Sequence, residues 1–180
     1  MLAFVDEAWF SLTQPPALHA WTDGPAINMK EFYTDSADKQ QKAVAGYGLL
    51  RRDTNKVWLR MVEQRPDSEH TVAFLAWACE RLGLEGKKAL IVVWDNASWH
   101  KSKRVRQWLG SHNRSVKQTG GVRVVICQLP TRSPWLNPIE PHWIHGKRAA
   151  VAPDRRLGGV EMIERLCDYF GCDHLPALSN

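Results

Sequence analysis

The pattern of apolar and polar positions predicts strands in the first third of the chain. Residues 2–5 are apolar and lead directly into the acidic Asp6, which is typical of a short strand. Three further segments alternate well enough to be strands, namely residues 26–34, 42–52 and 56–64. Because short turns join such segments, we expect these strands to form an antiparallel meander.

Helical and strand patterns then alternate. A helix is expected from Ser68 to about Gly83, with one buried face at 3.6-residue spacing made of Val72, Leu75, Cys79 and Leu82. Residues 89–94 are apolar at every position, which predicts a central strand buried on both faces. A basic helix over residues 101–110 and a surface loop at residues 111–121 should follow, and then a second apolar strand over residues 122–129.

Two helices are expected in the last part of the chain. One begins near Pro138, and the other covers residues 159–170. The second helix is amphipathic, and its expected buried stripe is Val160, Ile163, Leu166, Cys167 and Phe170. Residues 175–180 follow no such pattern, so we expect them to be loose.

This order of elements predicts an α/β fold with a mixed sheet. The sheet should start as an antiparallel meander, continue with parallel buried strands, and be flanked by helices. We expect one domain over residues 1–150, with a C-terminal helix and tail over residues 151–180 packed on the same domain.

Composition excludes several classes of protein. Of the 180 residues, 44% are apolar and 24% are charged, which is typical of a globular domain, and no apolar run is long enough to cross a membrane. Four unevenly spaced cysteines and no secretion signal favour reduced thiols in the cytoplasm. A zinc site at Cys167, Cys172 and His174, together with His142 and His145, is the less favoured interpretation, and core packing of the cysteines is the favoured one.

The positive charge of the protein is concentrated in one segment. The net charge is +5, and the residues between Asp95 and Glu140 contain no acid. They contain eight basic residues: Lys101, Lys103, Arg104, Arg106, Arg114, Lys117, Arg123 and Arg132. Such a segment is typical of a protein that binds nucleic acid, but a solvated helix face would show the same pattern, and charge alone leaves both open.

Two acids stand at the ends of predicted strands. Asp6 follows the first strand, and Asp95 follows the fully apolar one. If these strands are neighbours, the two carboxylates lie close together and repel, unless a cation sits between them. Oxygen ligands favour a hard divalent ion such as Mg²⁺. A solvent-exposed strand end for Asp6 and a turn at Asp95 and Asn96 remain the alternatives.

A third acid, Glu140, lies in the proline-rich stretch LPTRSPWLNPIEPHW at residues 129–143. Local chemistry alone favours a capping role. Asn137 suits the N-cap of a helix, Pro138 suits its first position, and Glu140 then falls where a capping box has its glutamate. A metal ligand at Glu140 is the competing interpretation.

The three acids in their motifs resemble a known family. The stretches FVDEAWF, VVWDNASWH and LPTRSPWLNPIEPHW, in this order, resemble the DDE transposases of the mariner-like superfamily, in particular the bacterial insertion-sequence branch called IS six-thirty. The resemblance covers nearly the whole chain. It implies an RNase H-like catalytic domain, which agrees with the element order predicted above.

The resemblance also implies roles for individual residues. Asp6, Asp95 and Glu140 match the three catalytic acids, which would hold two Mg²⁺ or Mn²⁺ ions. Glu7 points to the other side of its strand and is a weaker candidate. Groups that support the acids are Asn96, His100 and Asn137. Candidate DNA contacts are Lys101, Lys103, Arg104, Arg106, Lys117 and Arg132. Bases of the DNA could stack on Trp99 and Trp135, and core packing is the alternative role of these tryptophans.

The implied activity is metal-dependent cleavage of transposon ends and strand transfer into target DNA containing TA, in the bacterial cytoplasm and at the nucleoid. Implied partners are transposon-end and target DNA, a second copy of the chain, and helix-turn-helix modules, which relatives carry before the first catalytic strand and which we expect on a separate or frameshifted polypeptide. Two alternatives stay open: a remnant that binds DNA or a full-length transposase without cutting, and another RNase H-like nuclease such as a junction resolvase.

Overall fold

The computed structural model describes residues 1–12, 18–20, 23–24, 27–29, 42–131, 133–152 and 156–179. The expected strand over residues 26–34 lies mostly outside these ranges, and within them it contributes only a short strand, β3. No helix in the described ranges has the length and apolar character needed to cross a membrane.

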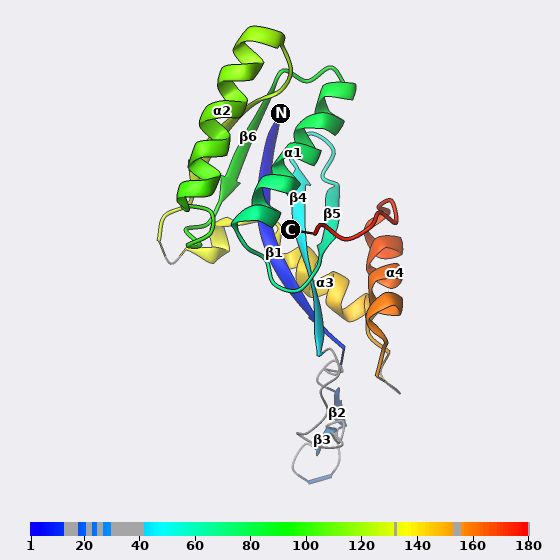
Figure 1. Ribbon diagram of the computed structural model, residues 1–180. Helices are drawn as coiled ribbons and strands as arrows, with labels where there is room; N and C mark the ends of the chain where they lie inside the picture. The colour runs from blue at the N-terminus through cyan, green and yellow to red at the C-terminus, as the bar shows by residue number, and fades with distance from the viewer. Residues whose placement is uncertain are drawn as a thin grey trace.

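A five-stranded mixed sheet forms the centre of the molecule (Figure 1). Its strand order is β5-β4-β1-β6-β7. The strands are β1 (Leu2–Ser11), β4 (Ala43–Arg51), β5 (Val57–Val62), β6 (Ala89–Trp94) and β7 (Arg123–Gln128). Strands β1, β4 and β5 are antiparallel, whereas β1, β6 and β7 run parallel, as the sequence predicts. A separate two-stranded sheet pairs β2 (Leu18–Ala20) with β3 (Ile27–Met29).

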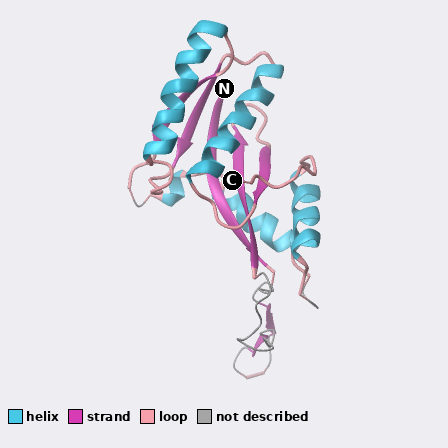
Figure 2. Ribbon diagram, in the orientation of Figure 1, coloured by secondary structure: helices cyan, strands magenta, loops and turns pink. Residues whose placement is uncertain are grey.

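Helices cover both faces of the sheet (Figure 2). They are α1 (Ser68–Leu84), α2 (Lys103–Thr119), α3 (Glu140–Ala150) and α4 (Gly159–Phe170), with a short 3-10 turn, η1 (Pro134–Leu136), before α3. One core lies between the sheet and α1 with α2, and a second core lies between the sheet and α3 with α4. Side chains alternate along β1, so Val5 joins the first core whereas Ala8 joins the second.

The register of β1 decides where its acids lie. Asp6 pairs with Gly48 of antiparallel β4. On the other side of β1, Phe4 pairs with Val93 of parallel β6. The prediction that Asp6 ends this strand is wrong, because β1 continues its pairing with β4 as far as Ser11. Continuing the β1–β6 register by two residues places Asp6, in the middle of β1, level with Asp95, which directly follows β6. The expectation that the first strand and the fully apolar strand are neighbours is therefore confirmed.

The prediction that β6 is buried on both faces is wrong. Leu90, Val92 and Trp94 are buried, but Ile91 on the opposite face is 36% exposed. The reason is that α3 and α4 pack over β1, β4 and β5 and leave this face of β6 open. Strand β7 is an edge strand, and its Val125 is 40% exposed.

The surface loop expected at residues 111–121 is also wrong, because α2 continues to Thr119. Its second half covers the free edge of β7. The Asn113 side chain accepts the Val124 N–H at 2.9 Å and donates to the Val124 carbonyl at 2.8 Å, as a neighbouring strand would. His112 also contacts the Val122 carbonyl, at 2.9 Å. These contacts explain why a polar segment without an apolar stripe remains helical.

Helix α1 agrees with its prediction, and Asp67 caps it by accepting the backbone N–H groups of Glu69 and His70. In α4 the predicted stripe is correct at Leu166 and Cys167, but Val160 is 73% exposed. The tail is not loose throughout: Leu178 is buried and donates its N–H to the Met61 carbonyl at 2.8 Å, beside the edge strand β5.

Replacing Asn113 with Ala should lower the free energy of unfolding by about 1–3 kcal/mol, because it leaves the Val124 N–H and carbonyl without their partner. Urea denaturation followed by circular dichroism measures this loss. Gln118→Ala, an exposed position on the same helix, should change the free energy by less than about 0.5 kcal/mol. Equal stability of both variants would show that Asn113 does not hold α2 on the sheet edge.

Candidate active site

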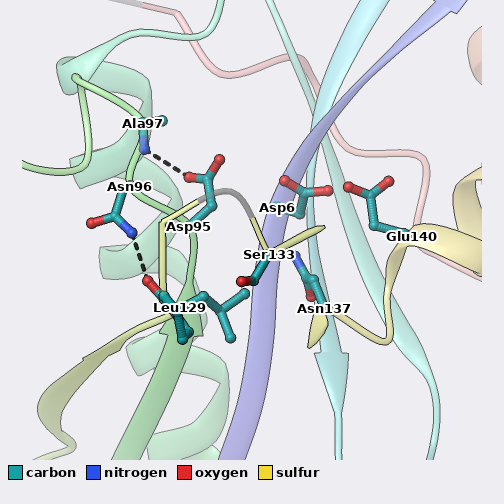
Figure 3. Close-up of a pocket in the computed structure, with 9 residues that line it drawn as sticks. Asp6, Asp95, Asn96, Ala97, Leu129, Ser133, Asn137 and Glu140 are labelled. Carbon is teal, nitrogen blue, oxygen red and sulfur yellow. Dashed lines mark hydrogen bonds between the residues drawn. The ribbon is translucent and has the colours of Figure 1, made fainter. Parts of the chain in front are cut away.

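A cavity of about 290 Å³ opens beside the middle of β1, where β6 ends and α3 begins (Figure 3). Its described lining is Asp6, Asp95, Asn96, Ala97, Leu129, Pro130, Ser133, Asn137 and Glu140. The structure thus brings the three sequence-predicted acids to one cavity from three separate elements. No Lys, Arg or His is among these lining residues, so the cavity is acidic without a built-in cation.

Asp6 is the most enclosed of the three acids, at 9% exposure. Its Oδ2 accepts the indole N–H of Trp143 at 2.9 Å. Burial raises the pKa of Asp6 to about 7, against the lowering effect of the Trp143 hydrogen bond, and the charges of Glu7 and Glu140 add to the rise. A metal ion beside Asp6 would favour its ionised form.

Asp95 is more open, with 52% of its side chain exposed. Its Oδ1 accepts the Ala97 N–H at 2.9 Å and lies 3.0 Å from Nδ1 of His100. The His100 hydrogen bond holds the pKa of Asp95 below its ordinary value, although partial burial acts in the opposite direction. Both contacts engage Oδ1, which leaves Oδ2 for a ligand in the cavity.

His100 joins Asp95 to Glu7, a contact that the sequence did not predict. Its Nε2 lies 2.6 Å from Oε1 of Glu7, and both side chains are almost fully buried. Burial alone would lower the pKa of His100, but the hydrogen bonds to Asp95 and Glu7 outweigh it and raise the pKa to about 9. Trp94 stacks on the imidazole at 4.4 Å, and Trp99 donates its indole N–H to Glu7 at 3.2 Å.

Glu7 points to the opposite face of β1 from Asp6, as expected, and there its carboxylate binds His100 and Trp99. Adjacent acids on a buried strand require a compensating charge on each face, and a histidine five residues after Asp95 is the one signal that could have indicated the partner.

The capping interpretation of Glu140 is wrong. Helix α3 begins at Glu140 itself, and its N-cap, Ile139, makes no side-chain hydrogen bond. Residues 138–139 form a turn instead. The side-chain oxygen of Asn137 accepts no backbone N–H of the described residues, and its main-chain carbonyl accepts the Glu140 N–H at 3.2 Å. The Glu140 carboxylate is directed toward Asp6 across the cavity (Figure 3).

Two asparagines were expected to support the acids. Asn96 donates to the Leu129 carbonyl at 2.6 Å and so ties the loop after β6 to the end of β7. Asn137 is 3% exposed, and its Oδ1 has no hydrogen-bond partner among the described residues. A buried oxygen of this kind at the cavity wall suits a cation or a water molecule bound to one.

The donors at the cavity fit a hard divalent cation. They are three carboxylates and a buried amide oxygen, with no sulfur or imidazole ligand in the lining. As the side chains lie, no three His, Cys, Asp or Glu residues in the described ranges are grouped closely enough to hold one ion. This also counts against the zinc interpretation, since Cys172 donates to the Val57 carbonyl and His174 contacts Asp168.

The candidate DNA contacts lie on and before α2. Lys101 precedes α2 and is exposed, as are Lys103, Arg106 and Lys117 on the helix itself. Arg104 is paired with Glu69 at 2.6 Å. Arg132 falls outside the described residues. Trp135, on η1, is 76% exposed, whereas the Trp99 ring is half-buried against His100.

Comparison with protein families gives one match. A model described as DDE superfamily endonuclease matches residues 1–161. No curated protein matches the chain significantly.

Solved structures with a similar fold include complexes of the Mos1 transposase. The Mos1 transposase paired-end complex with left transposon end superposes with a TM-score of 0.67 at 17% identity, covering 94% of this chain and 47% of that one. The Mos1 mariner paired end complex with Mn gives 0.65 at 19% identity, covering 94% and 48%. The chain thus spans about half the length of these proteins. The expected RNase H-like mixed sheet is confirmed.

In EDTA, the protein should lose stability as the pH rises from 6.5 to 9. The pKa of His100 is raised from 6.5 to about 9, so its contribution is fully present below pH 6.5 and is lost as the pH passes about 9. The raised pKa of Asp6 acts in the same direction, with loss as the pH passes about 7. We expect a loss on the order of 2–3 kcal/mol, or roughly 4–10 °C in Tm, measured by calorimetry.

Two variants identify the source of this pH dependence. Glu7→Gln removes one of the two carboxylates that hold the His100 proton, so it should flatten the fall in Tm. Glu69→Gln breaks only the exposed pair with Arg104 and should leave the fall unchanged. A Tm that stays constant or rises over this interval would contradict a charged His100 in the folded protein.

Proposed function

Because the chain belongs to the DDE superfamily of endonucleases, we propose that it is the catalytic domain of a transposase that cleaves transposon ends and transfers them to target DNA. The observation that carries this proposal is the acidic cavity between the middle of β1 and the end of β6, with Asp6, Asp95 and Glu140 in its lining. Nuclease-type phosphoryl transfer is the chemistry of this family, and carboxylates at such a site serve as metal ligands.

Asp6, Asp95 and Glu140 would hold two Mg²⁺ or Mn²⁺ ions, with Asn137 Oδ1 at the wall of the same cavity. When bound, such ions polarise the phosphodiester and activate the attacking oxygen. The chain's own residues keep the ligands in place: His100 holds Oδ1 of Asp95, and Trp143 holds Oδ2 of Asp6. Asn96 fixes the loop that carries Asp95.

The proposed reaction has two displacements at phosphorus. In cleavage, a water molecule loses one proton to solvent as its oxygen bonds to the phosphorus at the transposon end, the P–O3′ bond breaks, and the leaving 3′-oxygen takes a proton from solvent. In transfer, the freed 3′-hydroxyl loses its proton and attacks a target phosphodiester, whose P–O3′ bond breaks in turn. One cavity serves both steps because each exchanges one oxygen for another at phosphorus.

Exposed cations on and before α2 would neutralise phosphates beside the cavity, and the exposed Trp135 would stack on a base. For Trp99, the bond to Glu7 favours a structural role.

The finer assignment rests on the family resemblance that the stretches VVWDNASWH and LPTRSPWLNPIEPHW carry. This resemblance implies the bacterial insertion-sequence branch and a target that contains TA. In this proposal, residues 1–150 form the catalytic domain and residues 151–180 form a C-terminal helix and tail packed on it. The protein would act in the cytoplasm, at the DNA of the nucleoid. Mos1 structures carry transposon ends, Mn and Mg in their names. By analogy, end recognition by helix-turn-helix modules and pairing with a second copy of the chain complete the proposed assembly.

Asp95→Ala should abolish metal-dependent nicking of DNA. Removing one metal ligand forfeits several kcal/mol of transition-state stabilisation, which corresponds to a rate loss of about 10³-fold or more. The assay follows conversion of supercoiled plasmid to open circles with Mg²⁺, Mn²⁺ or EDTA. Asp168→Ala, an exposed acid on α4 away from the cavity, is the matched control and should cut at the wild-type rate.

Equal cutting by Asp95→Ala and wild type, or cutting in EDTA, would contradict the assignment of the cavity. Binding of DNA without cutting under every metal condition would instead favour a remnant that regulates a full-length transposase.

A double substitution, Lys103→Ala with Arg106→Ala, should weaken DNA binding at low salt and reduce its salt dependence. Each lost phosphate contact lowers the slope of log K against log salt by about 1, so we expect a decrease of roughly 2. Fluorescence anisotropy with a labelled duplex at several salt concentrations measures it. Lys56→Ala, in the turn between β4 and β5, should leave the slope unchanged, and a similar slope in the double variant would exclude α2 from the interface.

A further inference from the structure

Trp143 lies one helical turn after Glu140 and is 2% exposed. Its ring occupies a slot that exists only because residue 48 is a glycine. A Cβ at Gly48 would lie 2.1 Å from Cη2 and 2.6 Å from Cζ2 of the ring, closer than any side chain tolerates. Gly48 is the residue of β4 that pairs with Asp6, so the ring of Trp143 lies directly over the strand pair that carries the first acid.

The ring is held from the other sides as well. Phe10 of β1 and Phe170 of α4 both meet it edge to face, with centroid distances of 6.0 and 5.7 Å. Phe170 in turn lies against Gly146 of α3, where a Cβ would come within 2.7 Å of its ring. The position of α3 on the sheet is therefore set by close contacts around one indole ring, and Glu140 is the first residue of that helix.

The one polar atom of this ring reaches the site. Nε1 of Trp143 donates to Oδ2 of Asp6 at 2.9 Å in buried surroundings. Since a buried N–H needs a partner and a buried carboxylate needs a donor, this contact fixes the orientation of both groups. The same side chain thus sets where α3 sits and which way the Asp6 carboxylate points.

We propose that Trp143 is a positioning residue of the three-acid site. Its ring packs against Gly48, and it thereby places Asp6 and Glu140 relative to each other so that both face the cavity. It acts through Asp6 and touches neither DNA nor metal. The metal-binding part of this inference rests on the proposed function. Trp143→Phe keeps an aromatic ring in the slot and removes the N–H, which separates the positioning contact from simple packing.

The test uses Mn²⁺ as the probe. Binding is measured by electron paramagnetic resonance of free Mn²⁺ at a pH where the wild type is folded. We expect Trp143→Phe to weaken Mn²⁺ binding about tenfold, because loss of a group that orients a metal ligand typically weakens metal binding by about 10- to 100-fold. Trp77→Phe is the matched control: it removes an indole packed in the other core and should bind Mn²⁺ as the wild type does. Unchanged affinity in Trp143→Phe would overturn the proposal.

A metal-free measurement keeps the proposal testable if Trp143→Phe fails to fold. This measurement compares ¹H–¹⁵N spectra of the wild type and of Asp6→Asn, both of which keep Trp143. In the variant, the indole proton of Trp143 should move upfield and exchange faster with water, while the Trp77 signal stays in place. No shift would overturn the contact. Absence of Mn²⁺ binding in wild type and all variants would overturn the metal-site function, and the indole shift would then still decide whether Trp143 holds Asp6.

Discussion

Burial of negative charge in the middle of β1 is the constraint on which this structure depends. Asp6 and Glu7 are neighbours on a central strand, so they face opposite layers of helices, and both side chains are nearly withdrawn from water. A buried carboxylate costs several kcal/mol unless donors or cations compensate it. Each face of the sheet supplies its own compensation: His100 and Trp99 reach Glu7, and Trp143 reaches Asp6.

The residues that compensate Glu7 and Asp6, namely His100 and Trp143, also connect these acids to Asp95 and Glu140. His100 comes from the segment after β6, and its second nitrogen holds Asp95 at the end of that strand. Trp143 comes from α3, which begins with Glu140. Satisfying the acids of β1 therefore brings the other two acids to the same edge of the sheet. The Asp6 side remains only partly compensated, as its raised pKa shows, and this is the side that opens into the cavity.

Uneven cover of the sheet gives that cavity its opening. Helices α3 and α4 pack on β1, β4 and β5, so the same face of β6 and β7 stays exposed at Ile91 and Val125. The cavity lies at the border between the covered and the uncovered part, and the exposed Trp135 stands in the chain between Ser133 and Asn137 of its lining. A long polymer such as DNA could approach the acids there without any movement of the core. The exposed basic residues of α2 add the charge that such a substrate requires.

The sequence by itself determined the order of the main strands and helices and the mixed sheet, because apolar periodicity is a local signal. It also named Asp6, Asp95 and Glu140 as candidate acids and His100 as a supporting group. The structure brings these acids to one cavity and places His100 3.0 Å from Asp95. Only the tertiary structure decided what depends on contacts between distant segments. Residues 111–119 are helical because they cover the edge of β7, and β6 is open on one face because α3 and α4 pack elsewhere. The sequence favours a capping role for Glu140, but α3 begins at this residue. The sequence makes Glu7 a weaker candidate than Asp6, but His100 lies 2.6 Å from its carboxylate. Local chemistry assigns each residue its options, and the packing of remote partners selects among them.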